Sequence, residues 1–73
     1  MHRESAAWSD EVKALTRKFI KDGMIAAMKN IDGRFALMGY LKGEIILFDR
    51  KDISKKYRFN NAEELIGDGW VVD

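Results

Sequence analysis

The apolar positions in the first third of the chain recur at the period of an α-helix. They step by four, three, four and one residues along Trp8, Val12, Leu15, Phe19 and Ile20. Ser9 is a suitable N-cap, acidic residues follow it, and lysines lie near the far end, where the helix dipole favours positive charge. Gly23 is a typical stop signal. We therefore predict an amphipathic helix between Trp8 and Asp22, and we expect residues 1–7 to be a frayed lead-in.

The middle of the chain carries two turn signals, Asp32-Gly33 and Lys42-Gly43, each flanked by apolar residues. Asp-Gly in this setting favours a two-residue β-hairpin loop, so residues 24–50 are predicted to form an antiparallel meander. Two-residue loops would place Ile31 opposite Arg34 and Leu41 opposite Glu44. The weakest strand is Met24–Asn30, because its Met, Ala and Lys residues also favour a second helix. We favour the strand, since Gly23 interrupts the helical pattern.

This register makes both faces of the predicted sheet apolar. One face would hold Met24, Ala26, Met28, Phe35, Leu37, Leu41, Ile46 and Phe48, and the other Ile25, Ala27, Ile31, Ala36, Met38, Tyr40, Ile45 and Leu47. A sheet with one side in water alternates apolar and polar residues, so each of these faces needs a cover. Gly39, inside a strand, suggests a bulge, a bend or a close approach by another element, for which we expect the N-terminal helix.

The last third of the chain combines a short strand, a short helix and an extended end. Tyr57-Arg58-Phe59 alternates as a strand does, after a polar connection that begins at Arg50. A short helix follows, capped by Asn60 with Glu63 or by Asn61 with Glu64, and Gly67-Asp68-Gly69 ends it. Trp70-Val71-Val72 is suited to a last strand or an extended tail. The prediction is one α+β domain over residues 1–73, with a sheet of three to four strands.

Composition and charge exclude several classes of function. A chain of 73 residues with 47% hydrophobic and 34% charged residues is expected to be one globular domain. Its formal net charge of +1 produces no overall attraction to nucleic acid or to an anionic membrane. The sequence has no cysteine, which excludes disulfides and thiolate metal sites. Without a signal-peptide pattern at the N-terminus, a cytoplasmic location is expected.

The sequence shows no pattern typical of an active site. Its one histidine, His2, lies in the expected lead-in, and none of its serines has the surroundings of a nucleophile. The acidic pairs Asp10-Glu11 and Glu63-Glu64 stand at predicted helix starts, where capping explains them. We therefore predict a protein without enzymatic activity, cofactor or metal ion.

Two short helices cannot cover both faces of an apolar sheet, so we predict a protein–protein interaction or regulatory protein. A domain this small often gains stability from a second chain, which indicates a homodimer or another protein partner. Exposed apolar patches with Trp, Tyr and Met mark such interfaces. The predicted interface consists of Met38, Tyr40, Ile45, Leu47, Trp8 and Trp70. Whether the two tryptophans belong to the interface or to the core stays open at this point.

A nucleic-acid-binding module is the alternative. Five basic residues lie within nine positions, although the total charge is near zero: Arg50, Lys51, Lys55, Lys56 and Arg58. They would contact phosphates, and Tyr57 would stack on a base. Tyr57 and Phe59 share one face of a short strand, however, and such residues usually pack in a core. This reading therefore ranks below protein interaction.

Overall fold

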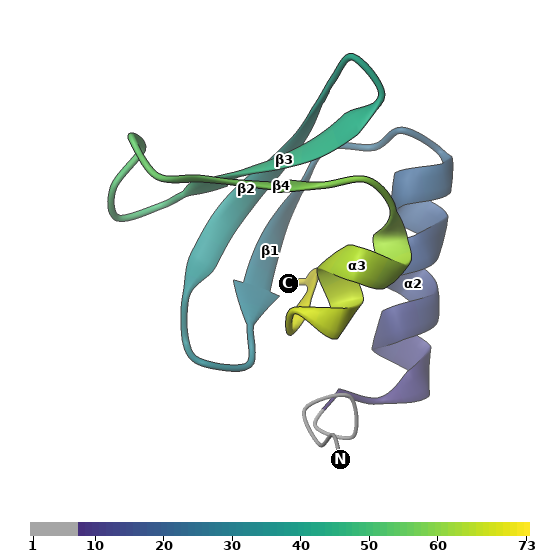
Figure 1. Cartoon of the computed structure of the whole chain (residues 1–73). Coiled ribbons are helices and arrows are strands. Elements are labelled where there is room, and N and C mark those ends of the chain that lie inside the picture. The colour runs from purple at the N-terminus through teal and green to yellow at the C-terminus, as the bar shows by residue number, and fades with distance from the viewer. Residues whose placement is uncertain (1–7) are drawn as a thin grey trace.

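The computed structural model describes residues 8–73 and shows an α+β fold, as predicted. The frayed lead-in expected at residues 1–7, with His2, lies outside the described residues. The elements, shown in Figure 1, are helix α2 (Asp10–Lys21), strands β1 (Ala26–Asn30), β2 (Phe35–Leu41), β3 (Glu44–Asp49) and β4 (Lys56–Phe59), helix α3 (Ala62–Gly67) and strand β5 (Trp70–Val72). The sheet has five strands, slightly more than expected, because the C-terminal segment pairs with β1.

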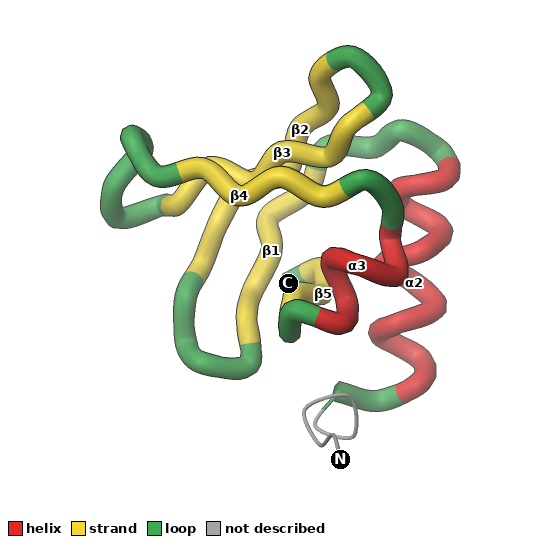
Figure 2. Tube along the Cα trace, viewed as in Figure 1, coloured by secondary structure: helices red, strands yellow, loops and turns green. Residues whose placement is uncertain are grey.

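All strand pairs are antiparallel, in the order β4-β3-β2-β1-β5. The sheet curls around α3, which contacts both edge strands, β4 and β5 (Figure 2). Tyr57 on β4 and Trp70 on β5 even touch, with ring centroids 5.6 Å apart. The helices therefore fill a concave inner face, and the outer face of the sheet is convex.

The two hairpins differ in the loops that join their strands. β2 and β3 are joined by the expected two-residue turn, in which Lys42 and Gly43 both have positive φ angles of 52° and 83°. This is the geometry of a type I′ turn. The first hairpin has one more loop residue than predicted, because the N–H of Asn30 donates to the carbonyl of Arg34. Gly33, with φ 96°, closes this three-residue loop.

The longer loop corrects the predicted register of β1. Ala26 faces Met38 instead of Gly39, and Leu37 faces Ala27 instead of Met28. The register of β2 on β3 is as predicted, with Leu37 opposite Phe48. Because side chains alternate between faces, a shift of one residue moves every side chain of β1 to the other side of the sheet. Ala26 and Met28 therefore belong to the inner face.

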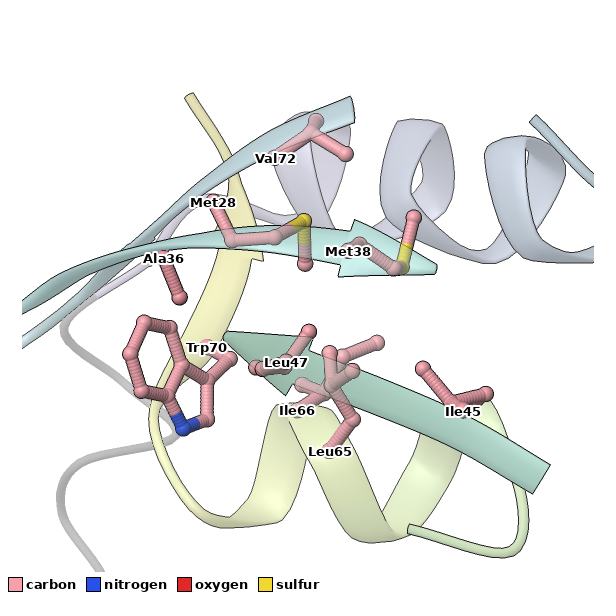
Figure 3. Close-up of a cluster of buried hydrophobic side chains, with 9 residues drawn as sticks. All are labelled: Met28, Ala36, Met38, Ile45, Leu47, Leu65, Ile66, Trp70 and Val72. Atoms are coloured by element: carbon pink, nitrogen blue, oxygen red, sulfur yellow. The ribbon is translucent and has the colours of Figure 1, made fainter. Parts of the chain in front are cut away.

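The core lies between the inner face and the two helices (Figure 3). Its buried members are Met28, Ala36, Met38, Ile45, Leu47, Leu65, Ile66, Trp70 and Val72. Figure 3 shows that Leu65 and Ile66 project from α3 toward Leu47 on the sheet. Val12, Phe19 and Ile20 of α2 pack against the same cluster. Burial of apolar side chains on this scale is the main stabilising contribution in a domain of this size.

Helix α2 closes one edge of the sheet through a buried hydroxyl. Thr16 is fully buried, and its Oγ1 accepts a hydrogen bond of 3.0 Å from the backbone N–H of Val72. The same hydroxyl donates to the carbonyl of Val12 at 2.7 Å. The unpaired backbone groups of an edge strand can pair with another chain. Here Thr16 of α2 accepts a hydrogen bond from one of these groups on β5. The other edge, β4, carries the charged residues Lys56 and Arg58.

Both helices begin where their caps predict. The Ser9 side chain accepts from the N–H of Val12, and the Asn61 side chain accepts from the N–H of Glu64 at 2.9 Å. Glu64 in turn accepts from the backbone N–H of Asn60, also at 2.9 Å. Of the two predicted caps for the second helix, the structure therefore has Asn61 with Glu64.

Candidate interaction surface

The outer face of β2 and β3 is an apolar surface with no helix over it in the described part of the chain. Four large side chains lie on it: Phe35 is 47% exposed, Leu37 48%, Leu41 54% and Phe48 37%. The strand pairing places Phe35, Leu37 and Phe48 next to one another, since Leu37 faces Phe48 and Phe35 is two residues from Leu37. Leu41 lies further along β2, beyond Gly39. Single exposed apolar residues are ordinary, whereas a contiguous group marks an interaction surface.

Gly39 and Ile46 lie side by side on this outer face. A Cβ added to Gly39 would stand 3.7 Å from Cε2 of Phe48, which is ordinary contact. The group that approaches Gly39 is therefore the ring of Phe48. Our expectation of the N-terminal helix at this position is wrong, because α2 packs against the inner face of the sheet. Ile46 is only 4% exposed.

Most residues of the predicted interface lie in the core instead. Met38, Ile45, Leu47 and Trp70 are at most 3% exposed and pack against the helices. They have no surface to offer a second chain, so the face that we predicted as the interface is the one the protein covers itself. The residues that a second chain can reach are those of the opposite face, such as Leu37 and Phe48. The predicted register paired Leu37 with Met28, whereas the structure pairs it with Ala27.

The two remaining interface candidates make polar contacts inside the chain. Tyr40 is 37% exposed, and its hydroxyl donates to the carbonyl of Met24 at 2.7 Å. Partial burial raises the pKa of Tyr40. Trp8 is half-buried, and its Nε1 donates to the carbonyl of Gly69 at 2.8 Å. Both residues therefore fasten neighbouring segments together.

Two of the five predicted basic residues lie on β4 and point to the outer face. Lys56 and Arg58 alternate with the inward-facing Tyr57 and Phe59 on β4. Nζ of Lys56 lies 5.8 Å from the ring centroid of Phe48. Arg58 and Glu44 approach to 3.9 Å, and both are well exposed, so this ion pair contributes little.

The other three basic residues belong to the connection between β3 and β4. Arg50 directly follows β3, and its N–H donates to the carbonyl of Phe35 at 2.9 Å, which continues the register of the sheet. Lys51 and Lys55 are exposed. Among the residues described, Arg50, Lys51, Lys55 and Lys56 have no carboxylate within 4.0 Å.

Tyr57 does not belong to the basic surface. It packs against the core, its hydroxyl donates to the carboxylate of Asp49 at 3.1 Å, and its ring contacts Trp70. The guanidinium of Arg34 lies about 5 Å from both rings, at 5.0 Å from Tyr57 and 5.1 Å from Trp70. Tyr57 therefore packs against the core, the position that we weighed against base stacking.

Asp49 organises the basic connection. This mostly buried carboxylate accepts hydrogen bonds from the backbone N–H groups of Lys51 at 2.8 Å and Asp52 at 3.1 Å. These bonds, aided by the Tyr57 hydroxyl, lower the pKa of Asp49. They favour the charged form because all three groups donate to it. The carboxylate thereby fixes the loop that presents Arg50 and Lys51.

A shallow cleft of about 590 Å³ adjoins the outer face where the first hairpin loop meets the β3–β4 connection. Its lining includes Phe35 together with three bases and three acids: Arg34, Arg50, Lys51, Asp32, Asp49 and Asp73. Arg34 is already paired with Asp32 at 2.8 Å, and Asp49 holds the loop. The cleft has no group of His, Cys, Asp and Glu side chains arranged to hold a metal ion within residues 8–73.

Comparisons with protein families, with curated proteins and with solved structures found no match for this chain. Across residues 8–73, neither helix has the length and apolar character that crossing a bilayer requires.

Proposed function

We propose that this protein is a small interaction protein without enzymatic activity, and that it associates with a second copy of itself through the outer face of the sheet. The observation that supports this proposal is the exposure of Phe35, Leu37, Leu41 and Phe48 on one uncovered face. Both helices pack against the inner face, so the outer face of β2 and β3 is left open within residues 8–73. At the β5 end of the same face, Val71 is fully buried. The cytoplasmic location expected from the sequence is part of the proposal.

The size of the face indicates a weak dimer. Four neighbouring strands at ~4.8 Å spacing, with about six residues each at ~3.3 Å, form a surface on the order of 400 Å². Two such faces bury less than the roughly 1,200 Å² that stable, specific interfaces bury in total. The convex shape of the sheet reduces the contact further. We therefore expect a dimer that dissociates on dilution.

Substitution of Leu37 by lysine tests the proposal. Leu37 is 48% exposed at the centre of the apolar group, so Leu37→Lys places a charge in the interface while leaving the core intact. Leu15→Lys is the matched control, because Leu15 is 44% exposed but lies on α2. Circular dichroism establishes that both variants keep their fold.

Light scattering across a dilution series then gives the mass of each protein. We expect a concentration-dependent mass for the original protein and for Leu15→Lys, and a monomer at every concentration for Leu37→Lys. A strict monomer at millimolar concentration of the original protein would overturn the proposal. Equal dissociation of both variants would show that the contact does not use the outer face.

A further inference from the structure

Two phenylalanine rings lie near each other on the outer face. Phe48 pairs with Leu37, and Phe35 occupies the next outward position of β2, so the two phenylalanines are diagonal neighbours. Diagonal neighbours on adjacent strands are roughly 7 Å apart. Exposed rings on adjacent strands of an antiparallel sheet are a platform on which unstacked bases can lie. An interface that only buries apolar side chains would not require aromatic rings at positions 35 and 48.

The charges around the rings favour an anionic partner. The strand register gives the outer face four bases, Lys29, Arg50, Lys56 and Arg58, against the two acids Glu44 and Asp73. The acids pair with Arg58 and Lys29 only at 3.9 Å each. Arg50 is next to Phe35 in the register and Nζ of Lys56 lies over the Phe48 ring, and neither base has a carboxylate within 4.0 Å among the described residues. Two copies of this face carry the same net charge. A polyanion complements it.

The shape of the surface favours a flexible, narrow partner. The outer face is the convex side of a curled sheet, so a rigid flat partner contacts only part of it. A single strand of nucleic acid follows such a surface, and each base stacked on an aromatic ring contributes about 1–3 kcal/mol. An acidic peptide matches the charges but has no regular array of planar groups for the two rings.

We propose that the outer face also binds single-stranded nucleic acid, with bases stacked on Phe35 and Phe48 and phosphates contacting Arg50 and Lys56. This site differs from the one predicted around Tyr57, because its aromatic residues come from β2 and β3. The proposal shares its surface with the self-association described above but does not depend on it. Nucleic acid and a second copy exclude each other from the face.

Fluorescence anisotropy with labelled single strands of about 12 thymidines or 12 uridines tests the proposal at low and high salt. We expect binding of one or both strands at low salt and a clear loss of affinity as salt rises. Either sugar satisfies the proposal, and the ratio of the two affinities distinguishes DNA from RNA. Absence of binding to both strands at low salt overturns it.

Two sets of variants separate this proposal from self-association. The double variant Phe35→Leu, Phe48→Leu keeps the face apolar and so keeps the dimer, but it removes the rings on which bases stack. We expect its affinity for the single strand to fall by about tenfold or more. Leu37→Lys has the opposite effects, since it dissociates the dimer and leaves binding equal or stronger. The pair Arg50→Gln and Lys56→Gln lowers the salt dependence by about two phosphate contacts.

Other partners appear as distinct outcomes of the same titration. Equal affinity for a DNA duplex, or an unchanged affinity in the double leucine variant, would show that charge alone attracts the strand and would overturn base stacking. Equal affinity for poly-glutamate would assign the face to an acidic protein. Thermal unfolding of each variant confirms that the comparison is made between folded proteins.

Discussion

The rings of Tyr57 and Trp70 are 5.6 Å apart, although the two residues belong to opposite edge strands of a five-stranded sheet. This contact is possible because the sheet curls around α3, whose Leu65 and Ile66 fill the concave side. A chain of 73 residues thereby builds a complete core on one side of its sheet. The same curl turns the other side outward, with apolar residues still on it.

The two tryptophans should respond differently to the same substitution. The indole N–H of Trp70 is buried with no acceptor among the described residues, whereas that of Trp8 donates to Gly69. Phenylalanine at position 70 keeps the aromatic contact with Tyr57 and removes an unpaired donor, which offsets the lost volume. We expect Trp70→Phe to remain within about 1 kcal/mol of the original stability, against about 3–5 kcal/mol for Trp70→Ala.

Urea unfolding measures these changes. Trp8→Phe is the comparison, and it should cost about 1 kcal/mol because the Gly69 carbonyl loses its donor. A loss for Trp70→Phe as large as that for Trp70→Ala would contradict the account of the buried indole.

Thr16 should be sensitive to the loss of its hydroxyl and tolerant of the loss of its methyl group. Thr16→Val keeps the volume but leaves the N–H of Val72 unpaired inside the protein, at a cost of about 1–3 kcal/mol. Thr16→Ser keeps both hydrogen bonds and loses one methyl group, at about 1 kcal/mol. Hydrogen exchange of the Val72 amide is the most direct readout, and equal protection in both variants would be inconsistent with this role.

Acid should weaken the fold partly through Asp49. Its pKa is lower in the folded protein than its ordinary value of 3.8, because backbone N–H groups donate to the carboxylate. The stabilisation is therefore fully present above that value and is lost as the pH falls through the lower, folded pKa. Asp49→Asn removes this contribution, so stability measured by urea unfolding from pH 6 to pH 2 should fall less steeply in the variant. An identical slope would exclude Asp49 from the acid response.

Salt should affect the two proposed interactions of the outer face in opposite directions. Each face has four bases and two acids, so two copies repel weakly, and screening by added salt should strengthen self-association. Binding of a single-stranded nucleic acid releases counterions, so salt should weaken it. Sedimentation equilibrium at about 50 mM and 500 mM salt measures the first effect. A dimer that weakens with salt would indicate an ionic interface in place of an apolar one.

Local signals in the sequence predicted local structure correctly. Ser9 and Asn61 start the helices, and Lys42-Gly43 forms the expected two-residue turn. The strand β1 was also predicted correctly, although its residues favour a helix as well. In each case the determining interactions lie within a few residues of one another in the chain.

The candidate site was harder to predict because it depends on register. Asp32-Gly33 fits a two-residue and a three-residue loop equally well, and the difference of one residue decides which side of β1 joins the core. With both faces apolar, the sequence also gives no signal for which face the helices cover. In the structure the helices cover the face that holds Met38 and Leu47, and the other face, with Phe35, Leu37 and Phe48, stays exposed.

Nuclear magnetic resonance over a dilution series tests the central claim, that this protein associates with a second copy through the outer face of its sheet. Amide chemical shifts report the contact residue by residue without any substitution. The account predicts concentration-dependent shifts along β2 and β3, around Leu37 and Phe48, with the amides of α2 unchanged. Shifts confined to α2, or none up to millimolar concentration, would contradict it.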